Sequence, residues 1–237
     1  MPTLVHRKEW TGLEHETWKE MYHRQEASRR NMAYLIFEDG LDVLGFTEKK
    51  IPDLDSINAK LNQLTGWKGV LVKGLEEGAD FYPMLARREF PLGNFIRDKK
   101  DLSYTPEPDI FHDLYGHIPF YANKKYADAC WEFAKRASKY VDQPEKLVQW
   151  ERLFWFTYEF GLIETPKGRR IFGGGILSSY GECIYSMDEV NGPEVLPFDL
   201  EVIRNQAFRI DEMQKRLFIL KNPEQLYDCL DDFEAGM

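Results

Sequence analysis

The segment 144–162 carries a dense stripe of aromatic residues and constrains the fold more than any other feature of the chain. Leu147, Trp150, Phe154 and Tyr158 recur at steps of three or four residues, which places them on one face of a helix. A second long periodic segment, 121–140, precedes it. We therefore expect these two helices to form the core of the molecule.

Shorter segments complete the expected architecture. Apolar residues at helical spacing predict two consecutive helices over 14–44, an amphipathic helix over 53–64, a helical stretch over 81–86 and a final helix over 200–206. Short apolar runs predict strands over 67–73 and 216–220. The fold class is therefore mainly α with a few short β-strands. Because no repeat or low-complexity tract interrupts the 237 residues, we expect a single domain over 1–237.

Charge and cysteine content narrow the class of function. Lys and Arg number 31 against 40 Asp and Glu, and the net charge of −9 disfavours nonspecific binding to nucleic acid or anionic membranes. Cys130, Cys183 and Cys229 are odd in number and far apart, which argues against a disulfide framework or a cysteine zinc site. Without a signal peptide or membrane-spanning run, we expect a cytoplasmic protein that acts on small molecules.

Two of the five histidines, His112 and His117, lie in one segment, TPEPDIFHDLYGHIP. Imidazole is the commonest protein ligand for first-row metals. Five residues advance about 500° around an α-helix, so an unbroken α-helix would hold the two rings about 140° apart. We therefore expect the helix of this segment to end near Gly116, which would place a metal at the helix end. Two hydrogen-bonded histidines without a metal are the alternative.

Glu159 stands inside the apolar run LFWFTYEFG. Burial of an ionised carboxylate there is costly unless a cation compensates, although an amphipathic helix could instead expose it. Two histidines and one carboxylate leave coordination positions open and suit oxygen activation at Fe(II), but the same ligand types serve zinc hydrolases. The HExxH signature of such hydrolases is absent, because Asp113 follows His112 and the second histidine comes one residue late.

Three motifs resemble those of the tetrahydropterin-dependent aromatic amino acid hydroxylases: TPEPDIFHDLYGHIP from Thr105, WFTYEFGL from Trp155 and GGGILSSYGE from Gly173. They stand in the family's order and close to its spacing, and a weaker likeness extends from about Trp18 towards Phe233. The resemblance implies the catalytic-domain fold of this family. It also implies a monomeric bacterial-type enzyme without a regulatory domain or an oligomerisation tail.

The resemblance assigns the metal and cofactor residues by position. It makes His112, His117 and Glu159 the ligands of a mononuclear non-haem iron. It also implies a set of residues that bind the pterin through the backbone, ring stacking or an acidic side chain: Gly74, Leu75, Phe81 and Asp113.

The resemblance assigns the substrate residues in the same way. Arg97 falls where the family pairs an arginine with the carboxylate of the amino acid, and Asp109 would brace this arginine without touching the substrate. The other implied residues form the walls and the polar side of an aromatic pocket: Tyr104, Thr105, Pro108, Trp155, Phe160, Gly175, Ser178, Ser179 and Glu182.

The implied activity is a monooxygenase reaction in which Fe(II), a tetrahydropterin and dioxygen hydroxylate the ring of an aromatic amino acid. Phenylalanine to tyrosine is the reaction that we expect first. Within the family, the alternatives are a tryptophan or tyrosine hydroxylase, or an enzyme that hydroxylates phenylalanine at the meta position. A zinc hydrolase and a non-catalytic binding domain are the alternatives from other classes. The expected partners are the amino acid and the pterin, with no nucleic acid and no membrane.

Overall fold

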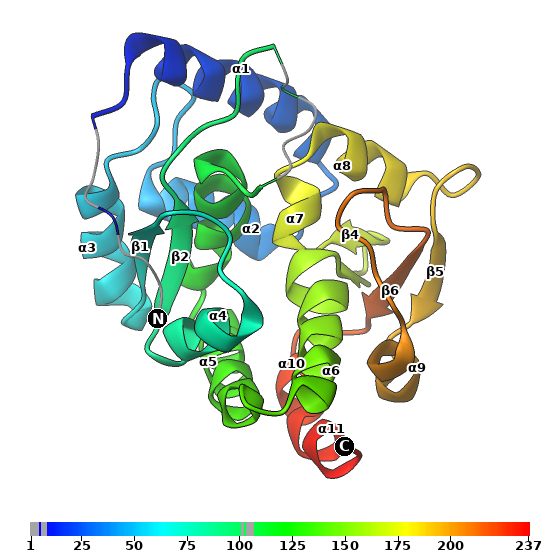
Figure 1. Ribbon diagram of the computed structural model, residues 1–237. Coiled ribbons are helices and arrows are strands. Elements are labelled where there is room, and N and C mark those ends of the chain that lie inside the picture. The colour runs from blue at the N-terminus through cyan, green and yellow to red at the C-terminus, as the bar shows by residue number, and fades with distance from the viewer. Residues whose placement is uncertain (1–4, 6–8, 101, 103–106) are drawn as a thin grey trace.

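The computed structural model describes residues 5, 9–100, 102 and 107–237. Helices dominate it, as predicted, and two small sheets flank a central group of helices that includes α6 and α7 (Figure 1). The α-helices are α1 (Gly12–Arg29), α2 (Leu35–Leu44), α3 (Leu54–Thr65), α4 (Gly78–Ala86), α5 (Lys124–Ala137), α6 (Pro144–Phe154), α7 (Gly174–Leu177), α8 (Tyr180–Met187), α9 (Leu200–Asn205), α10 (Gln225–Asp228) and α11 (Leu230–Ala235).

The strands form two separate sheets. In the first, β1 (Lys68–Val72) pairs in parallel with β2 (Glu89–Gly93). The second has the order β4-β3-β6-β5, in which β3 (Leu162–Ile163) pairs antiparallel with β4 (Arg170–Ile171). In the same sheet, β6 (Arg216–Leu220) runs parallel to both β3 and β5 (Glu194–Pro197).

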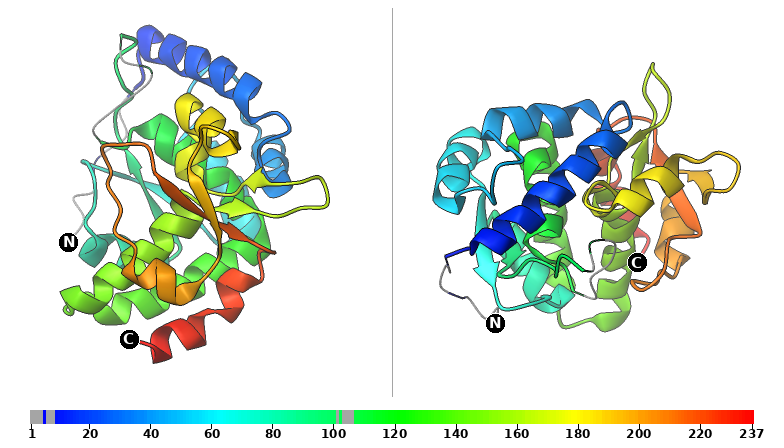
Figure 2. Two further views of the ribbon diagram at one scale, coloured as in Figure 1. Left: turned by 90° about the vertical axis from the view of Figure 1, so that its right-hand side faces the viewer. Right: turned by 90° about the horizontal axis from the view of Figure 1, so that it is seen from above.

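Local sequence signals explain where the first helices begin. Thr11 caps α1 in a capping box with Glu14, and Asp53 caps α3 by accepting a hydrogen bond from the backbone N–H of Ser56 at 2.9 Å. The left view of Figure 2 places α1 along the top of the molecule, away from α11 at the C-terminus at the bottom. Among the described residues, no helix combines the length and apolar character that a membrane span requires.

Two segments wind as π-helices, and both correct the sequence-based expectation. Residues Phe111–His117 form the first (η1), which continues through a 3-10 helix, Ile118–Ala122 (η2), instead of ending at Gly116. Residues Trp155–Glu159 form the second (η4), at the end of α6, where the periodicity had predicted one α-helix up to residue 162. In that turn the N–H of Phe160 donates to the carbonyl of Trp155, five residues back, at 2.7 Å.

An aromatic cluster anchors the first π-helix in the core. Phe111 and Tyr115 stack on each other with ring centroids 4.5 Å apart, and Trp18 of α1 meets Phe111 edge-on at 5.1 Å. All three side chains are fully buried, so each contributes on the order of 2 kcal/mol of hydrophobic stabilisation. This packing fixes the back of the π-helix, while His112 and His117 lie against a cavity.

Several elements were not predicted from the sequence. Strand β2 was missed because its five residues, EFPLG, contain a proline and show no alternation. The helices α10 and α11 follow the one that was expected to be last, and Leu162 belongs to a strand instead of to the preceding helix. The predicted strand over 216–220 and the helices within 14–44 and 53–64 are confirmed.

Candidate metal centre and active-site cavity

The side chains of His112, His117 and Glu159 converge in the structure. One ligand atom from each lies within 4.8 Å of the others. Nε2 of His117 is 2.9 Å from Oε2 of Glu159, and Nε2 of His112 is 3.4 Å from Oε1 of the same carboxylate. Two imidazole nitrogens and one carboxylate therefore face a single point, as a metal site requires.

The π-helical winding explains how histidines five residues apart can meet. In a π-helix the repeat of the hydrogen bonds is i to i+5, so residues at this spacing are stacked along one side. The sequence argument assumed an α-helix and therefore needed a break at Gly116. Gly116 has a different role, because a Cβ there would lie 2.5 Å from the carbonyl oxygen of Gly174. Its missing side chain allows α7 to pack closely against the π-helix.

Ser178 fixes the protonation pattern of His112. The Ser178 hydroxyl donates to the carbonyl of Gly175 at 2.9 Å and lies 2.9 Å from Nδ1 of His112. Both contacts are satisfied together only when the hydroxyl donates to Gly175 and Nδ1 of His112 donates to the hydroxyl oxygen. Nε2 is then left with a free lone pair directed towards Glu159, which is the tautomer that a metal ligand needs.

Burial and charge set the ionisation of His112 and Glu159. Burial lowers the pKa of His112 to about 4, so the imidazole is neutral at physiological pH. Burial disfavours the charged form of Glu159, but the two neighbouring histidines hold the pKa of this carboxyl below its usual value. A neutral imidazole beside an ionised carboxylate is the form in which both groups bind a divalent cation.

The glycine run 173–175 forms a wall directly behind the ligands. A Cβ on Gly173 would lie 2.2 Å from the backbone oxygen of Glu159, and one on Gly174 would lie 2.5 Å from Nδ1 of His117. A Cβ on Gly175 would lie 2.2 Å from Oε1 of Glu159. Gly174 begins α7, and the three glycines allow this helix to approach the ligands closely.

Arg97 and Asp109 form a buried pair beside the first histidine. Arg97 donates from Nε and Nη2 to the two carboxylate oxygens of Asp109, each at 2.8 Å. Asp109 also accepts from the backbone N–H of His112 at 3.0 Å. Although burial opposes ionisation, the hydrogen bonds from Arg97 hold the pKa of Asp109 below its usual value. Asp109 thus holds two nitrogens of the guanidinium and leaves Nη1 for a weaker 3.4 Å contact to the carbonyl of Leu102.

A cavity of about 470 Å³ opens in front of the three ligands. It brings together most of the predicted site residues, namely Gly74, Leu75, Phe81, Arg97, Pro108, His112, Asp113, His117, Trp155, Glu159, Phe160, Gly175, Ser178, Ser179 and Glu182. Asp109 lies behind Arg97 and does not line the cavity. Tyr104 and Thr105 lie outside the described residues.

Burial raises the pKa of two further carboxyl groups in the cavity. Burial raises the pKa of Asp113 well above its usual value, even though the backbone N–H of Gly93 donates to Oδ2 at 2.7 Å. Burial also raises the pKa of Glu182 to about 7. Oε2 of Glu182 is buried and has no hydrogen-bond partner among the described residues. A buried polar atom without a partner, in a cavity, is typical of a functional position.

The cavity also contains residues that the sequence did not single out. Phe90 of β2 stacks on His117 with ring centroids 5.0 Å apart, and Phe208 stacks on Trp155 at 4.3 Å and 14°. Ile210 lines the same wall. The strand that carries Phe90 was not predicted, and the segment between α9 and β6 that carries Phe208 and Ile210 has no periodicity. No signal in the sequence alone would have found them.

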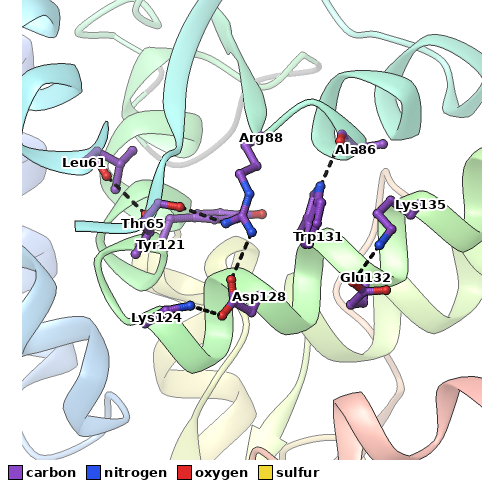
Figure 3. Close-up of polar contacts among 10 residues, drawn as sticks. All are labelled: Leu61, Thr65, Ala86, Arg88, Tyr121, Lys124, Asp128, Trp131, Glu132 and Lys135. Carbon is purple, nitrogen blue, oxygen red and sulfur yellow. Dashed lines mark hydrogen bonds and ion pairs between the residues drawn. The ribbon is translucent and has the colours of Figure 1, made fainter. Parts of the chain in front are cut away.

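A second cavity, of about 540 Å³, lies at the surface beside α5, and we call it the surface cavity. Figure 3 shows part of its wall, where Arg88 donates to Asp128 at 3.1 Å, Lys124 pairs with the same carboxylate, and Trp131 donates to the carbonyl of Ala86. Arg88 also lies over the Trp131 ring at 4.2 Å. None of the predicted site residues that the structure describes lines the surface cavity.

Comparison with known proteins agrees with this geometry. The family model described as biopterin-dependent aromatic amino acid hydroxylase matches residues 3–237. The chain belongs to this family. Its relatives include proteins named phenylalanine-4-hydroxylase from Ralstonia nicotianae, 39% identical over 97% of this chain and 72% of the relative, and from Chromobacterium violaceum, 41% identical over 93% and 73%.

Solved structures of the aromatic amino acid hydroxylase family share the fold. Phenylalanine hydroxylase from C. violaceum bound to cobalt has a TM-score of 0.93 and 36% identity, with 99% of this chain and 86% of that chain covered. A structure of the same enzyme with iron(III) and 7,8-dihydrobiopterin has a TM-score of 0.90 and 38% identity, with 96% and 82% covered. The predicted catalytic-domain fold is therefore confirmed.

Proposed function

We propose that this protein is a non-haem iron, tetrahydropterin-dependent monooxygenase that converts phenylalanine to tyrosine with dioxygen. The observation that carries the proposal is the convergence of His112, His117 and Glu159 at a cavity lined by aromatic residues. The names of the bacterial relatives support phenylalanine as the substrate, and the C. violaceum structure with iron and dihydrobiopterin supports the cofactors.

In this proposal Nε2 of both histidines and the carboxylate of Glu159 hold Fe(II). The donor set fits this ion, because Ser178 holds His112 in the metal-binding tautomer and Glu159 is ionised. When bound, iron and the reduced pterin would together supply the electrons that activate dioxygen for hydroxylation. The buried walls exclude water from the reacting centre.

Arg97 is proposed to bind the carboxylate of the amino acid while Asp109 holds its guanidinium in place. Trp155, Phe160 and Pro108 would then orient the ring towards the metal. Gly175 keeps the space beside Glu159 open. The polar residues Ser178, Ser179 and Glu182 border the same region of the cavity, and we assign Tyr104 and Thr105 to it by resemblance alone.

The pterin is proposed to occupy the part of the cavity near α4. Phe81 of this helix lines the cavity, and offset stacking on its ring would hold a flat heterocycle. Gly74 and Leu75 offer backbone groups to the hydrogen-bonding edge of the cofactor. Asp113 supplies an acidic group between this region and His112, which it approaches to 3.9 Å.

We further propose that residues 1–237 act as a single catalytic domain and as a monomer in the cytoplasm, with the amino acid and the pterin as partners. One contiguous cluster of buried hydrophobic residues, which includes Trp18, Phe133 and Phe233, supports the single domain. Light scattering on the purified protein tests the monomer.

The decisive experiment incubates the iron-loaded protein with tetrahydrobiopterin, dioxygen and, in turn, phenylalanine, tyrosine and tryptophan. We expect tyrosine from phenylalanine, with the ring position of the hydroxyl identified by NMR. The Glu159→Ala variant serves as the inactive control. Metal analysis distinguishes iron from zinc. A protein that holds iron but consumes no oxygen with any of the three amino acids would contradict the proposal.

A further inference from the structure

The indole of Trp155, which lines the candidate substrate cavity, is held by a residue far away in the sequence. Its Nε1–H donates to Oε1 of Gln214 at 3.1 Å. Trp155 itself is partly buried, but Gln214 is only 6% exposed and lies outside the cavity lining. Buried glutamines are uncommon, and the amide atoms of a buried glutamine are normally hydrogen-bonded.

The hydrogen bonds of Gln214 define its orientation. Its Nε2 group donates to the carbonyl of Arg209 at 2.7 Å and to that of Glu212 at 3.0 Å. Both amide protons are therefore used within the segment that connects α9 to β6. The amide oxygen must then face the indole, because a flipped amide would direct donors at a donor and an acceptor at two acceptors.

The same segment, residues 206–215, covers Trp155 from a second direction. Phe208 stacks on the indole at 4.3 Å, and Ile210, which is 64% exposed, lines the cavity beside it. Arg216, the first residue of β6, donates to Oε1 of Gln206 at 2.6 Å and so links the two ends of the segment. The segment runs between α9 and β6 (orange in Figure 1) and is not itself part of a helix or a strand.

We infer that Gln214 is a positioning residue that sets the orientation of Trp155, and through it the placement of the substrate ring in the cavity. The inference rests on the proposed function, because it takes Trp155 as the wall against which an aromatic ring packs. Gln214 touches neither the ligand residues nor the cavity. Its effect must therefore pass through the indole N–H and through the contact of Phe208 with the same ring.

The test uses the iron-loaded full chain with Gln214→Leu, which removes the acceptor and keeps a similar volume. We expect the KM for phenylalanine to rise about 3- to 10-fold, the effect of one lost hydrogen bond, while the KM for the pterin stays within about twofold. We also expect less tyrosine formed per pterin oxidised, because a misplaced ring fails to intercept the oxidant.

Gln206→Leu is the matched control. Gln206 belongs to the same segment and also makes a side-chain hydrogen bond, but to Arg216 instead of Trp155. It should leave both KM values and the yield of tyrosine per pterin unchanged. If Gln206→Leu changes them as much as Gln214→Leu does, the segment has only a general structural role and the inference is wrong.

A double-mutant cycle with Trp155→Phe tests whether the effect passes through the indole N–H. The phenylalanine ring has no donor, so Gln214→Leu should add little to the loss already caused by Trp155→Phe. Fully additive effects would overturn the inference.

If Gln214→Leu does not fold, Trp155→Phe alone must reproduce the selective rise in the KM for the amino acid. A wild-type KM in Trp155→Phe would overturn the inference.

The same measurements separate the inference from the proposed function. A wild-type protein that produces no hydroxylated amino acid contradicts the function. An active wild type whose Gln214→Leu variant keeps the same yield and the same KM for phenylalanine contradicts only the role of Gln214.

Discussion

The two cavities of this protein differ in whether their charged groups are paired with an opposite charge. In the surface cavity, Arg88 and Lys124 share the carboxylate of Asp128, and Lys125 pairs with Glu224 at 3.2 Å. In the candidate active site, by contrast, a carboxylate and two imidazoles face one point, and Oε2 of Glu182 has no hydrogen-bond partner among the described residues.

The difference shows that size does not identify a functional cavity. The surface cavity has the larger volume, about 540 Å³ against about 470 Å³, yet its cations are already neutralised by neighbouring side chains. Charged groups that are buried without an opposite charge are costly, and proteins keep them where a ligand completes the site. Changes in the active-site cavity should therefore alter chemistry, whereas matched changes in the surface cavity should not.

The largest effect is expected from Glu159→Ala. This variant removes a ligand and its negative charge, so the affinity for Fe(II) should fall by at least about 100-fold and turnover should be lost. Asp128→Ala, which removes a carboxylate of the surface cavity, should cost less than about 1 kcal/mol of stability and leave iron binding unchanged. Iron titration of both variants checks this contrast, and equal iron affinity in both would contradict the ligand assignment.

Arg97→Lys is expected to have the next largest effect. A lysine cannot reproduce the paired contact of a guanidinium with carboxylates, so the KM for phenylalanine should rise about 10- to 100-fold. The KM for the pterin should change much less. Arg88→Lys in the surface cavity is the matched control, and steady-state kinetics should show no change. An equal rise in both KM values for Arg97→Lys would argue against the carboxylate contact.

A smaller effect is expected from Ser178→Ala. Without the hydroxyl, Nδ1 of His112 loses its acceptor and the imidazole loses the contact that sets its tautomer, so iron affinity should drop about tenfold. Ser186→Ala removes another buried hydroxyl, which donates to the carbonyl of Cys183, and should leave iron affinity as it is. Competition with a chelator measures both variants; identical affinities would show that Ser178 does not orient the ligand.

The smallest effect is expected from Glu182→Gln, and it depends on pH. Because the folded-state pKa of Glu182 is raised to about 7, the folded protein keeps a proton that the unfolded chain releases above its own, lower pKa. The stabilisation by this proton is complete at low pH and is lost as pH rises through about 7. Relative to Glu182→Gln, the wild type should lose about 1 to 2 kcal/mol between pH 5 and pH 8. Urea unfolding at both pH values measures the difference, and parallel changes in the two proteins would refute it.

The metal site was predictable from the sequence because its ligands stand out within short segments of unusual composition. Two of five histidines in one segment and one carboxylate in an apolar helix mark His112, His117 and Glu159, and the structure brings them together. The predicted backbone conformation, a helix that ends near Gly116, was wrong. A helix break at Gly116 is unnecessary, because a π-helix already stacks residues five apart.

The outer wall of the cavity could not be predicted for a physical reason. Phe208 and Ile210 lie in a segment whose conformation depends on contacts with Trp155 and on the side-chain hydrogen bonds of Gln214 behind it, not on a repeating pattern. Phe90 was missed for a related reason, since strand β2 is defined by its pairing with β1. Residues whose conformation depends on such tertiary contacts need not show a repeating pattern of apolar residues in the sequence.

The glycine wall at 173–175 limits how this pocket can be redesigned or can diverge. Any side chain added there must grow into the ligands themselves, so the pocket cannot gain or lose room on that side without dismantling its coordination sphere. A larger or differently shaped arene must be accommodated at another wall, such as the one where Trp155 and residues 206–215 meet. Directed evolution towards new substrates should therefore accumulate its changes in that segment and leave the three glycines untouched.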